Sequence, residues 1–256
     1  MKLRIIQWNI KINSKTDGIA EFLLSKLEGN TVVGLQEVSE TAYEKISAHL
    51  RRNNAFSLHL RTPGKYEGRN RRMGVMVIVS GGEISNSQLV DCSVFPERTL
   101  VAKIRFDGLA VNALSFHSLT GVDYKKAKSS NFASIASFLD ENQVDILTCD
   151  ANEPEIDTFD EENVVCFDNR DKGEKASLLF GKTKVHSMID TYKEIARRSN
   201  LQLEDGYTHI LNGGKKKRYD FVYCNKAWKI LSSKVYYEDA IAAGSDHGMV
   251  VTDVVI

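Results

Sequence analysis

The sequence predicts an α/β protein, because apolar runs of strand length alternate with stretches whose apolar residues repeat at helical spacing. A hairpin is predicted where Asp107-Gly108 joins two such runs, which is the strongest short hairpin signal in the chain. The 256 residues contain no repeat, low-complexity tract or linker. A single domain over residues 1–256 is therefore the simpler interpretation, although this length also allows two small domains.

Strands and helices alternate along most of the chain. We expect strands at residues 3–8, 32–36, 55–60, 73–80, 100–106, 109–116, 144–149, 219–224, 228–235 and 249–256. We expect helices at residues 16–27, 41–51, 123–142 and 185–203. Thr16 or Asp17 can cap the first helix, and Thr41 can cap the second with Glu44 at the capping-box position. Residues 155–184 are polar and have no clear period, so no element is predicted there.

The charges of the chain balance, with 34 Lys and Arg residues against 34 Asp and Glu residues. This balance argues against a protein that coats nucleic acid by charge alone, but it allows a local basic groove. No leader-like segment and no apolar run of membrane-spanning length is present, so we expect no membrane association. The four cysteines form no CxxC pair, and we expect reduced thiols in a cytoplasmic protein.

Residues that can bind metals or move protons stand at the ends of the predicted strands. Those that follow an apolar run are Asn9, Glu37, His117, Asp150 and Asn152. Those that precede one are Asp220, Asp246 and His247. If the second group of strands runs antiparallel to the first, all these side chains meet at one end of the sheets. Polar residues at strand ends are common, but this set is richer in ligand and acid–base types than chance requires.

The stretch Asp150-Ala151-Asn152 ends a short apolar run that has the composition of a buried strand. Asp and Asn are turn formers, so a simple Asx-turn that ends the strand is one interpretation. A carboxylate and a carboxamide two residues apart can also hold a water molecule, a metal ion or a phosphate. The motif alone leaves these alternatives open.

Several short motifs occur in order along nearly the whole chain. They are Trp8-Asn9, Leu35-Gln36-Glu37-Val38, Phe95-Pro96-Glu97-Arg98, Ser115-Phe116-His117, Asp150-Ala151-Asn152, Arg218-Tyr219-Asp220-Phe221 and Ser245-Asp246-His247. Together they resemble the endonuclease/exonuclease/phosphatase superfamily, and the histidine and arginine motifs resemble its deoxyribonuclease-like branch. The resemblance implies a four-layer α/β sandwich, with two mixed β-sheets face to face and helices outside. It also implies a phosphoesterase that depends on Mg²⁺ or Mn²⁺.

The resemblance implies a role for each matching side chain. Glu37 would bind the metal with Asn9 beside it, and Asp246 would shape the metal site. Mg²⁺ prefers oxygen ligands and keeps several waters, so one carboxylate and one carboxamide suffice beside a substrate phosphate. The implied catalytic residues are His117, Asp150, Asn152, Asp220 and His247. Of these, His247 would be oriented by Asp220, and Asp150 would position or deprotonate the attacking water.

Positive side chains would hold the substrate. Arg98 would bind phosphate through its planar fork of donors. Arg71 in the basic loop at residues 69–72, together with Lys215, Lys216, Lys217 and Arg218, would suit a polyanion backbone. Such charge runs are more often solvated surfaces. We expect His49, His59, His186 and His209 to be surface or structural residues. The alternative for His209 is that Thr208-His209, which lies shortly before the Arg218-Tyr219-Asp220 motif, lines the site.

The chain also departs from the pattern of the superfamily. Lys11 stands where some nucleases carry an acidic residue, so a second metal ligand is not expected there. His117 stands where abasic-site enzymes tend to carry tyrosine, which favours the deoxyribonuclease-like branch. Cys149 and Ala151 change the packing around Asp150 and Asn152 but keep both functional side chains.

Three functions compete at this point. The first is a metal-dependent phosphodiesterase that acts on DNA as a monomer and without an obligate protein partner. The second is a phosphatase or phosphodiesterase that acts on a small or lipid phosphate such as a phosphoinositide. The third is a catalytically silent binding module, which the presence of Glu37, Asp150, Asp220 and His247 argues against.

Overall fold

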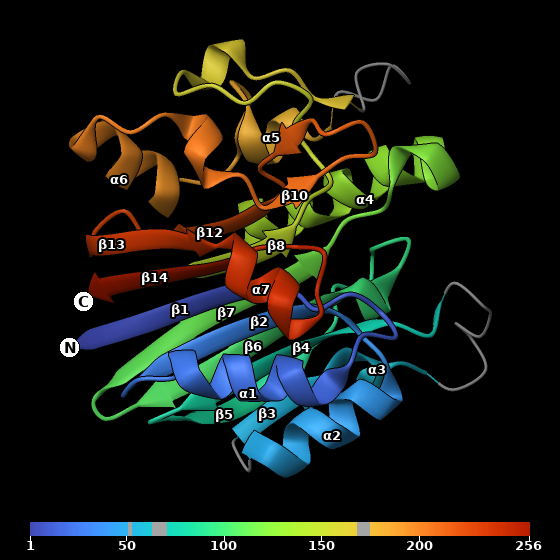
Figure 1. Ribbon diagram of the computed structural model, residues 1–256, viewed down its shortest axis with the longest axis vertical. Helices are drawn as coiled ribbons and strands as arrows, with labels where there is room; N and C mark the ends of the chain where they lie inside the picture. Colours follow the sequence, from blue (N-terminus) through green and yellow to red (C-terminus); the bar gives the residue numbers. More distant parts are fainter. Residues whose placement is uncertain (51–52, 63–70, 168–174) are drawn as a thin grey trace.

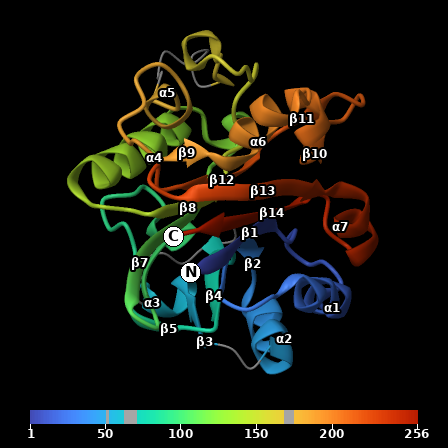
Figure 2. The ribbon, with the colours of Figure 1, turned by 90° about the vertical axis from the view of Figure 1, so that its left-hand side faces the viewer.

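The computed structural model describes residues 1–50, 53–62, 71–167 and 175–256. Two mixed six-stranded sheets pack face to face, and helices cover their outer faces (Figure 1 and Figure 2). This arrangement confirms the predicted four-layer α/β sandwich. Among the described residues, no helix combines the length and the apolar character that crossing a membrane requires.

The first sheet has the strand order β13-β14-β1-β2-β4-β3. Its strands are β1 (Lys2–Asn9), β2 (Thr31–Val38), β3 (Asn53–Phe56), β4 (Gly74–Ser80), β13 (Lys229–Tyr236) and β14 (Met249–Val255). The second sheet has the order β5-β6-β7-β8-β12-β9. Its strands are β5 (Glu83–Gln88), β6 (Thr99–Phe106), β7 (Leu109–His117), β8 (Ile146–Asp150), β9 (Ile189–Asp190) and β12 (Asp220–Cys224). A small ladder joins β10 (His209–Ile210) to β11 (Lys216–Lys217).

The helices are α1 (Thr16–Lys26), α2 (Glu40–Leu50), α3 (Ser57–Leu60), α4 (Gly121–Glu141), α5 (Ser177–Phe180), α6 (Thr191–Ser199) and α7 (Tyr237–Ala243). Most of the helices pack on the outer face of one sheet or the other, whereas α6 contacts β13 of the first sheet and β12 of the second. Buried side chains of α1, α2 and α7 pack on the outer face of the first sheet. Those of α4 and α5 pack on the outer face of the second. Each sheet is thus covered on both faces, which explains its nearly continuous apolar strands.

Strand β1 shows how alternation places the functional end of the sandwich. Ile6 and Trp8 point outward to the helices, whereas Leu3 and Ile5 point to the core between the sheets. The following inward positions are polar, since Gln7 and Asn9 hydrogen-bond to residues of the second sheet. The inner core therefore changes from apolar to polar along the strand.

The same change occurs in the neighbouring strands and produces a row of buried polar side chains between the sheets. We call this row the polar seam. It comprises Gln7, Asn9, Gln36, Ser115, His117, Thr148, Asp150 and Asp220. Strand β12 runs antiparallel to β8, and β14 runs antiparallel to β1. The predicted meeting of strand ends at one edge is therefore confirmed.

The sheets approach closely at Gly34 in β2. A Cβ atom added there would lie 2.1 Å from Thr148 Oγ1 and 2.7 Å from Ser115 Oγ. Any larger residue would push the sheets apart directly below the polar seam. Glycine at this position therefore sets the spacing of the strands that carry the site.

Some predicted elements differ from the observed ones. The strand predicted at residues 55–60 is β3 followed by the single turn α3. The helix predicted at residues 185–203 is shorter, because Asp190 caps α6 by accepting hydrogen bonds from Tyr192 N and Lys193 N, both at 3.1 Å. Ser39 rather than Thr41 caps α2, since its hydroxyl accepts from Ala42 N at 3.2 Å. Strand β5 and helix α7 were not predicted.

Candidate active site

The site lies at the polar end of the sandwich, where the loop before β14 folds over β1. The Ser245 hydroxyl donates to the carbonyl of Asn9 at 2.6 Å and accepts from His247 N at 2.9 Å. The Trp8 indole donates to the carbonyl of His247 at 3.0 Å. These bonds fix His247 above the seam although it is far from Asn9 in sequence.

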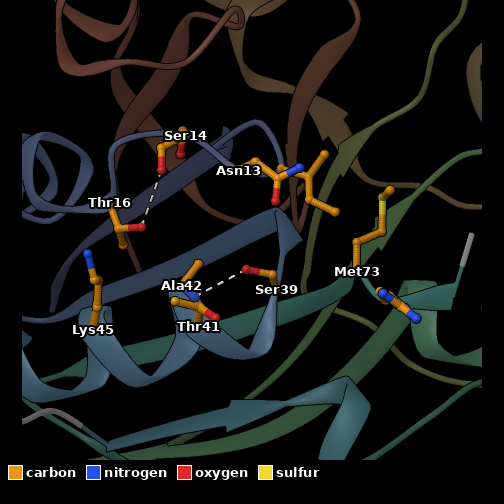
Figure 3. A pocket seen from close by; sticks show the side chains of 10 residues that line it. Asn13, Ser14, Thr16, Ser39, Thr41, Ala42, Lys45 and Met73 are labelled. Atoms are coloured by element: carbon orange, nitrogen blue, oxygen red, sulfur yellow. Dashed lines mark hydrogen bonds between the residues drawn. The ribbon is translucent and has the colours of Figure 1, made fainter. Parts of the chain in front are cut away.

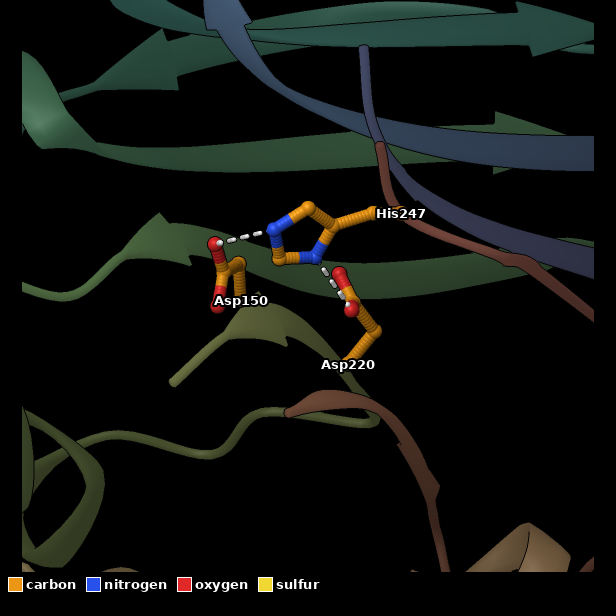
Figure 4. A group of neighbouring side chains, drawn as sticks. All are labelled: Asp150, Asp220 and His247. Atoms are coloured by element: carbon orange, nitrogen blue, oxygen red, sulfur yellow. Dashed lines mark hydrogen bonds and ion pairs between the residues drawn. The ribbon is translucent and has the colours of Figure 1, made fainter. Parts of the chain in front are cut away.

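His247 lies between two buried aspartates (Figure 4). Its Nδ1 is 2.8 Å from Asp220 Oδ2, and its Nε2 is 4.0 Å from Asp150 Oδ2. Asp220 is itself held from the first sheet by the Gln7 amide, which donates to its Oδ1 at 3.2 Å. The predicted pairing of His247 with Asp220 is therefore present in the structure.

The carboxylates change the proton affinity of this group. Burial alone would lower the pKa of His247, but Asp220 and Asp150 outweigh it and raise the pKa to about 10. Burial raises the pKa of Asp150 to about 7, with Asp220 adding to the rise and His247 opposing it. The His247 imidazole is thus protonated at neutral pH between two buried carboxylates.

Glu37 reaches the site through an irregular backbone. Its φ of 59° lies in the left-handed region, and the register of β2 against β4 shifts between Leu35 and Val38. This bulge turns the Glu37 carboxylate toward Asn9, whose Nδ2 donates to Glu37 Oε1 at 3.2 Å and to Asp150 Oδ2 at 2.8 Å. The other oxygen, Oε2, accepts from Ile12 N at 2.8 Å.

These groups fit a hard divalent cation. Glu37 Oε1 and Asp150 Oδ2 lie 3.7 Å and 3.6 Å from the same atom, His117 Nε2. Two carboxylate oxygens this close to one side chain favour a positive ion beside them. Asn9 would have to turn its carboxamide over to become a ligand, because its Oδ1 now accepts from Lys11 N at 2.9 Å.

Asp150, Asp220 and His247 also bring ligand atoms within 4.8 Å of one another and could enclose a metal ion. However, the hydrogen bond between Asp220 Oδ2 and His247 Nδ1 already occupies both atoms. We therefore place the more favourable cation position at Glu37, beside Asp150.

His117 is buried and uncharged at neutral pH. Burial lowers its pKa well below 6.5, and the positive charges of Arg98 and His247 lower it further. Arg98 is also buried, and its Nη1 lies 3.5 Å from the carbonyl of Ser118, the residue after His117. The structure thus brings His117 and the expected phosphate-binding arginine to the same edge of the site.

Asn152 is held in position by its backbone. Its φ is 49°, its N–H donates to Asp150 Oδ1 at 3.0 Å, and its carbonyl accepts from Lys128 Nζ at 2.8 Å. Lys128 is buried and also pairs with Glu153 at 2.6 Å. The Asx-turn interpretation of this stretch is correct as far as the backbone is concerned, and the turn keeps Asn152 beside the site.

Arg218 lies outside this cluster, contrary to expectation. Its Nη2 is 2.5 Å from Asp157 Oδ2 and its Nη1 is 2.8 Å from Asp190 Oδ2, while Lys193 Nζ is 2.7 Å from Asp157 Oδ1. We call these four residues the arginine network. Because two carboxylates engage its guanidinium, Arg218 is committed to ion pairs within the protein.

Some of the other expected substrate-binding cations are paired within the protein, and others are exposed. Lys217 is buried and donates to the carbonyl of Glu155, whereas Lys216 on β11 and Lys215 just before it are exposed. Arg71 pairs with the buried Glu97 at 3.2 Å. Arg69 lies outside the described residues. Asp246 is half-exposed and lies 3.4 Å from Lys11 Nζ, so its carboxylate faces solvent rather than the expected metal site.

Sequence reasoning missed one part of the site and favoured the wrong alternative for another. Gln36 exchanges hydrogen bonds with Gln7 and donates to Ser115 Oγ at 3.0 Å, so amides join the two sheets below Asp220. The sequence signal that could have identified Gln36 is a polar residue at an inward position of a buried strand. His209, expected to be structural, stacks on His247 with ring centroids 4.4 Å apart.

A polar cavity of about 600 Å³ lies next to Glu37 (Figure 3). Ile12, whose N–H binds Glu37, forms part of its wall. The remaining lining residues are Asn13, Ser14, Thr16, Ser39, Thr41, Ala42, Lys45, Arg72 and Met73. Two cations and four hydroxyl groups line it without a carboxylate, so the cavity suits an anionic ligand.

No protein-family model and no curated protein sequence matches the chain. Solved structures do match it. D. rerio TDP2 complexed with single-strand DNA product is 14% identical, with a TM-score of 0.68 and coverage of 100% of this chain and 99% of that one. An endonuclease/exonuclease/phosphatase from Bacteroides vulgatus is 14% identical, with a TM-score of 0.67 and the same coverage. The human Nocturnin catalytic domain with bound sulfate is 15% identical, with a TM-score of 0.66 and coverage of 99% and 94%.

These matches span the full chain at low identity, so they bear on the fold. They confirm the fold that the resemblance of the ordered motifs implied, since the Bacteroides structure carries the name of that superfamily. The chain therefore has the endonuclease/exonuclease/phosphatase fold.

Proposed function

We propose that the chain is a member of the endonuclease/exonuclease/phosphatase superfamily and hydrolyses phosphodiester bonds in DNA with the help of a divalent metal. One observation carries this proposal. His247 lies between Asp220 and Asp150 at the same edge as Glu37 and His117, so three carboxylates and two imidazoles meet there. Such an edge suits a metal ion and proton transfer together.

Glu37 would hold Mg²⁺ or Mn²⁺, and Asn9 would join it after turning its carboxamide. The bound ion would neutralise charge on a phosphoryl oxygen. Glu37 is suited to this task because its side chain is 22% exposed, so substrate can approach it, while the other carboxylates of the site are buried. The backbone N–H of Ile12 keeps the carboxylate directed at the site.

Asp150 and His247 would handle the protons of the reaction. Asp150 would position the attacking water and take its proton, because Asn9 and Asn152 N fix its two oxygens. Asp220 would orient the imidazole of His247 and keep Nδ1 protonated, so that Nε2 faces Asp150 and the phosphate.

The remaining side chains would bind the phosphate and the leaving group. Neutral His117 would donate a hydrogen bond to the leaving oxygen or to a phosphoryl oxygen. Arg98 and the Asn152 carboxamide would neutralise or hold the other phosphoryl oxygens. Both sheets contribute to this set, which supports our prediction that residues 1–256 act as one domain and as a monomer.

Two surfaces support DNA as the substrate. Lys215 and Lys216 are exposed at the end of the β10–β11 ladder, whose His209 stacks on His247, and the cavity with Lys45 and Arg72 lies beside Glu37. A strand that crosses the site would place successive phosphates near both. The single-strand DNA product bound to D. rerio TDP2 shows that this fold can accommodate such a polymer.

A small or lipid phosphate ester is the alternative, and one observation favours it. Three of the cations expected to grip a polyanion are engaged within the protein, namely Arg71, Lys217 and Arg218. Fewer free cations would suffice for a substrate with a single phosphate.

The test is hydrolysis by the purified protein with Mg²⁺ or Mn²⁺, measured in parallel on plasmid DNA, abasic DNA, RNA and soluble phosphate esters. We expect DNA cleavage that excess chelator abolishes. The Lys215→Ala/Lys216→Ala variant should bind DNA more weakly at low salt, with a salt slope reduced by roughly 0.9 per lost phosphate contact, and should retain cleavage of a small phosphodiester. Hydrolysis of small esters alone would favour the alternative, and undiminished hydrolysis in chelator would exclude the metal mechanism.

A further inference from the structure

The ring of His209 lies flat against the ring of His247. Their centroids are 4.4 Å apart and their planes differ by 28°. His209 also stacks on Tyr219, with centroids 6.0 Å apart and planes differing by 23°. This stack extends the candidate active site by one histidine to which the proposed reaction assigns no role.

The backbone holds His209 in this position. An antiparallel bridge joins His209 to His247, and Gly248 N donates to the carbonyl of Thr208 at 2.7 Å. The His209 Nδ1 lies 3.1 Å from the carbonyl of Asp246. His209 and His247 therefore belong to adjoining backbone segments, and their rings are held together.

The neighbouring Thr208 holds Asp220, the hydrogen-bond partner of His247, in position. Its buried hydroxyl accepts hydrogen bonds from Tyr219 N at 3.0 Å and from Asp220 N at 3.1 Å. The two residues Thr208 and His209 thus contact both Asp220 and His247. A displacement of this segment would change the geometry of both groups together.

A single hydrogen bond to Asp220 leaves the imidazole of His247 able to rotate about the line of that bond. A flat ring packed on its face removes this freedom. We infer that His209 is a positioning residue that fixes the ring plane of His247, and this inference rests on the proposed hydrolytic function.

The chemistry of the stack is consistent with this role. Burial lowers the pKa of His209, and the positive charge of His247 lowers it further, so the outer ring is neutral. A neutral aromatic face against a cationic imidazole is an attractive contact. His209 therefore supports His247 without competing for its proton.

The test compares His209→Ala, His209→Leu and His209→Phe, with His186→Ala as a matched control. His186 is also a partly buried histidine in aromatic contact, here with Tyr223 at 5.2 Å, but its partners lie outside the site. We would measure kcat and KM on bis(p-nitrophenyl) phosphate with Mn²⁺, together with melting temperature. We expect kcat to fall about 10- to 100-fold in the alanine and leucine variants, because small misplacements of reacting groups have effects of this size. We expect KM to be unchanged and the phenylalanine variant to stay within about 3-fold of the parent, since a flat ring remains.

Equal kcat in the leucine and phenylalanine variants would overturn the inference, because leucine fills the space without a flat ring. A second readout does not depend on activity. Side-chain ¹³C relaxation of His247 Cε1–H should show faster motion in the leucine variant than in the phenylalanine variant. If the parent hydrolyses no phosphodiester, the proposed function fails, and this relaxation measurement still decides whether His209 orders the ring. An equally rigid His247 in both variants would then refute the inference.

Discussion

The candidate active site and the arginine network are both buried clusters of charged side chains, but their charges are balanced differently. In the network, Arg218 and Lys193 meet Asp157 and Asp190, so two cations face two carboxylates. In the described part of the site, the three carboxylates of Glu37, Asp150 and Asp220 face two cations, His247 with its raised pKa and the buried Arg98.

This difference distinguishes a structural cluster from a functional one. A buried group with matched charges needs nothing from outside, and removing one member leaves an unpaired charge. A buried group with surplus negative charge must hold a proton or recruit a cation, which is useful for metal-assisted chemistry. Arg218 and Asp220 are two residues apart, yet they belong to opposite types.

The largest expected effect separates the two clusters by activity. Changing Asp220→Asn should lower kcat by about 10²- to 10⁴-fold, because His247 loses the carboxylate that orients it. The matched change Asp190→Asn removes a buried carboxylate from the arginine network and should leave kcat per folded molecule within about 3-fold. Steady-state hydrolysis with Mn²⁺ measures both. Similar losses in the two variants would erase the distinction.

The next largest effect concerns stability, and here we expect the arginine network rather than the candidate active site to be the more sensitive cluster. Changing Arg218→Met leaves Asp157 and Asp190 without their shared partner and should lower the free energy of unfolding by about 3–5 kcal/mol. Arg197→Met is the control, because Arg197 is largely exposed and contacts Glu194 and the carbonyl and ring of Phe159. It should change stability by less than about 0.5 kcal/mol. Denaturant unfolding gives both values, and an unaffected Arg218→Met variant would show that the network is dispensable.

Metal binding should stabilise the folded protein only through the candidate active site. At a concentration about 100 times its dissociation constant, Mn²⁺ should add roughly 2.7 kcal/mol to the unfolding free energy. The gain should be small in Glu37→Gln and intact in Glu40→Gln, whose side chain is exposed near His59. Thermal melts with and without Mn²⁺ provide the measurement. Equal stabilisation of the parent and Glu37→Gln would place the ion elsewhere.

The smallest effect is a dependence of stability on acid. Burial alone would raise the pKa of Asp157, but Arg218 and Lys193 hold it below 3.8. Asp157 therefore contributes stability that is fully present above pH 3.8 and is lost as the pH falls through its lower folded pKa. In Arg218→Met the loss should begin at higher pH. Unfolding measured across pH 2–6 would show this shift, and superimposable curves would argue against the pairing.

The sequence predicted those parts of the site that lie on strands with a regular alternation of inward and outward side chains. Asn9, Asp150 and Asp220 end or begin buried strands, and their meeting followed from strand direction alone. The location of Glu37 depended on a bulge that alternation does not reveal. The strand-end pattern and the motif resemblance both identified Glu37, because neither depends on its backbone conformation.

The ion pairing of Arg218 within the protein could not be predicted from its own motif. Its partners come from segments without a clear signal, since Asp157 lies in the irregular stretch and Asp190 in a region predicted as helix. His209 was assigned a structural role for the same reason, because a two-residue ladder such as β10–β11 leaves no periodic pattern. Long-range pairing of polar side chains, rather than local propensity, determined both positions.

The division of the site between sheets has a consequence for synthesis on the ribosome. The second sheet is built from one continuous stretch between Glu83 and Cys224, whereas the first needs strands from both ends of the chain. His247 precedes the last strand, which must insert between β13 and β1 before His247 can meet Asp220. A nascent chain can therefore complete the sheet that carries Asp150 and Asp220 while it is still catalytically incompetent, and hydrolytic capacity would arise only with the final strand.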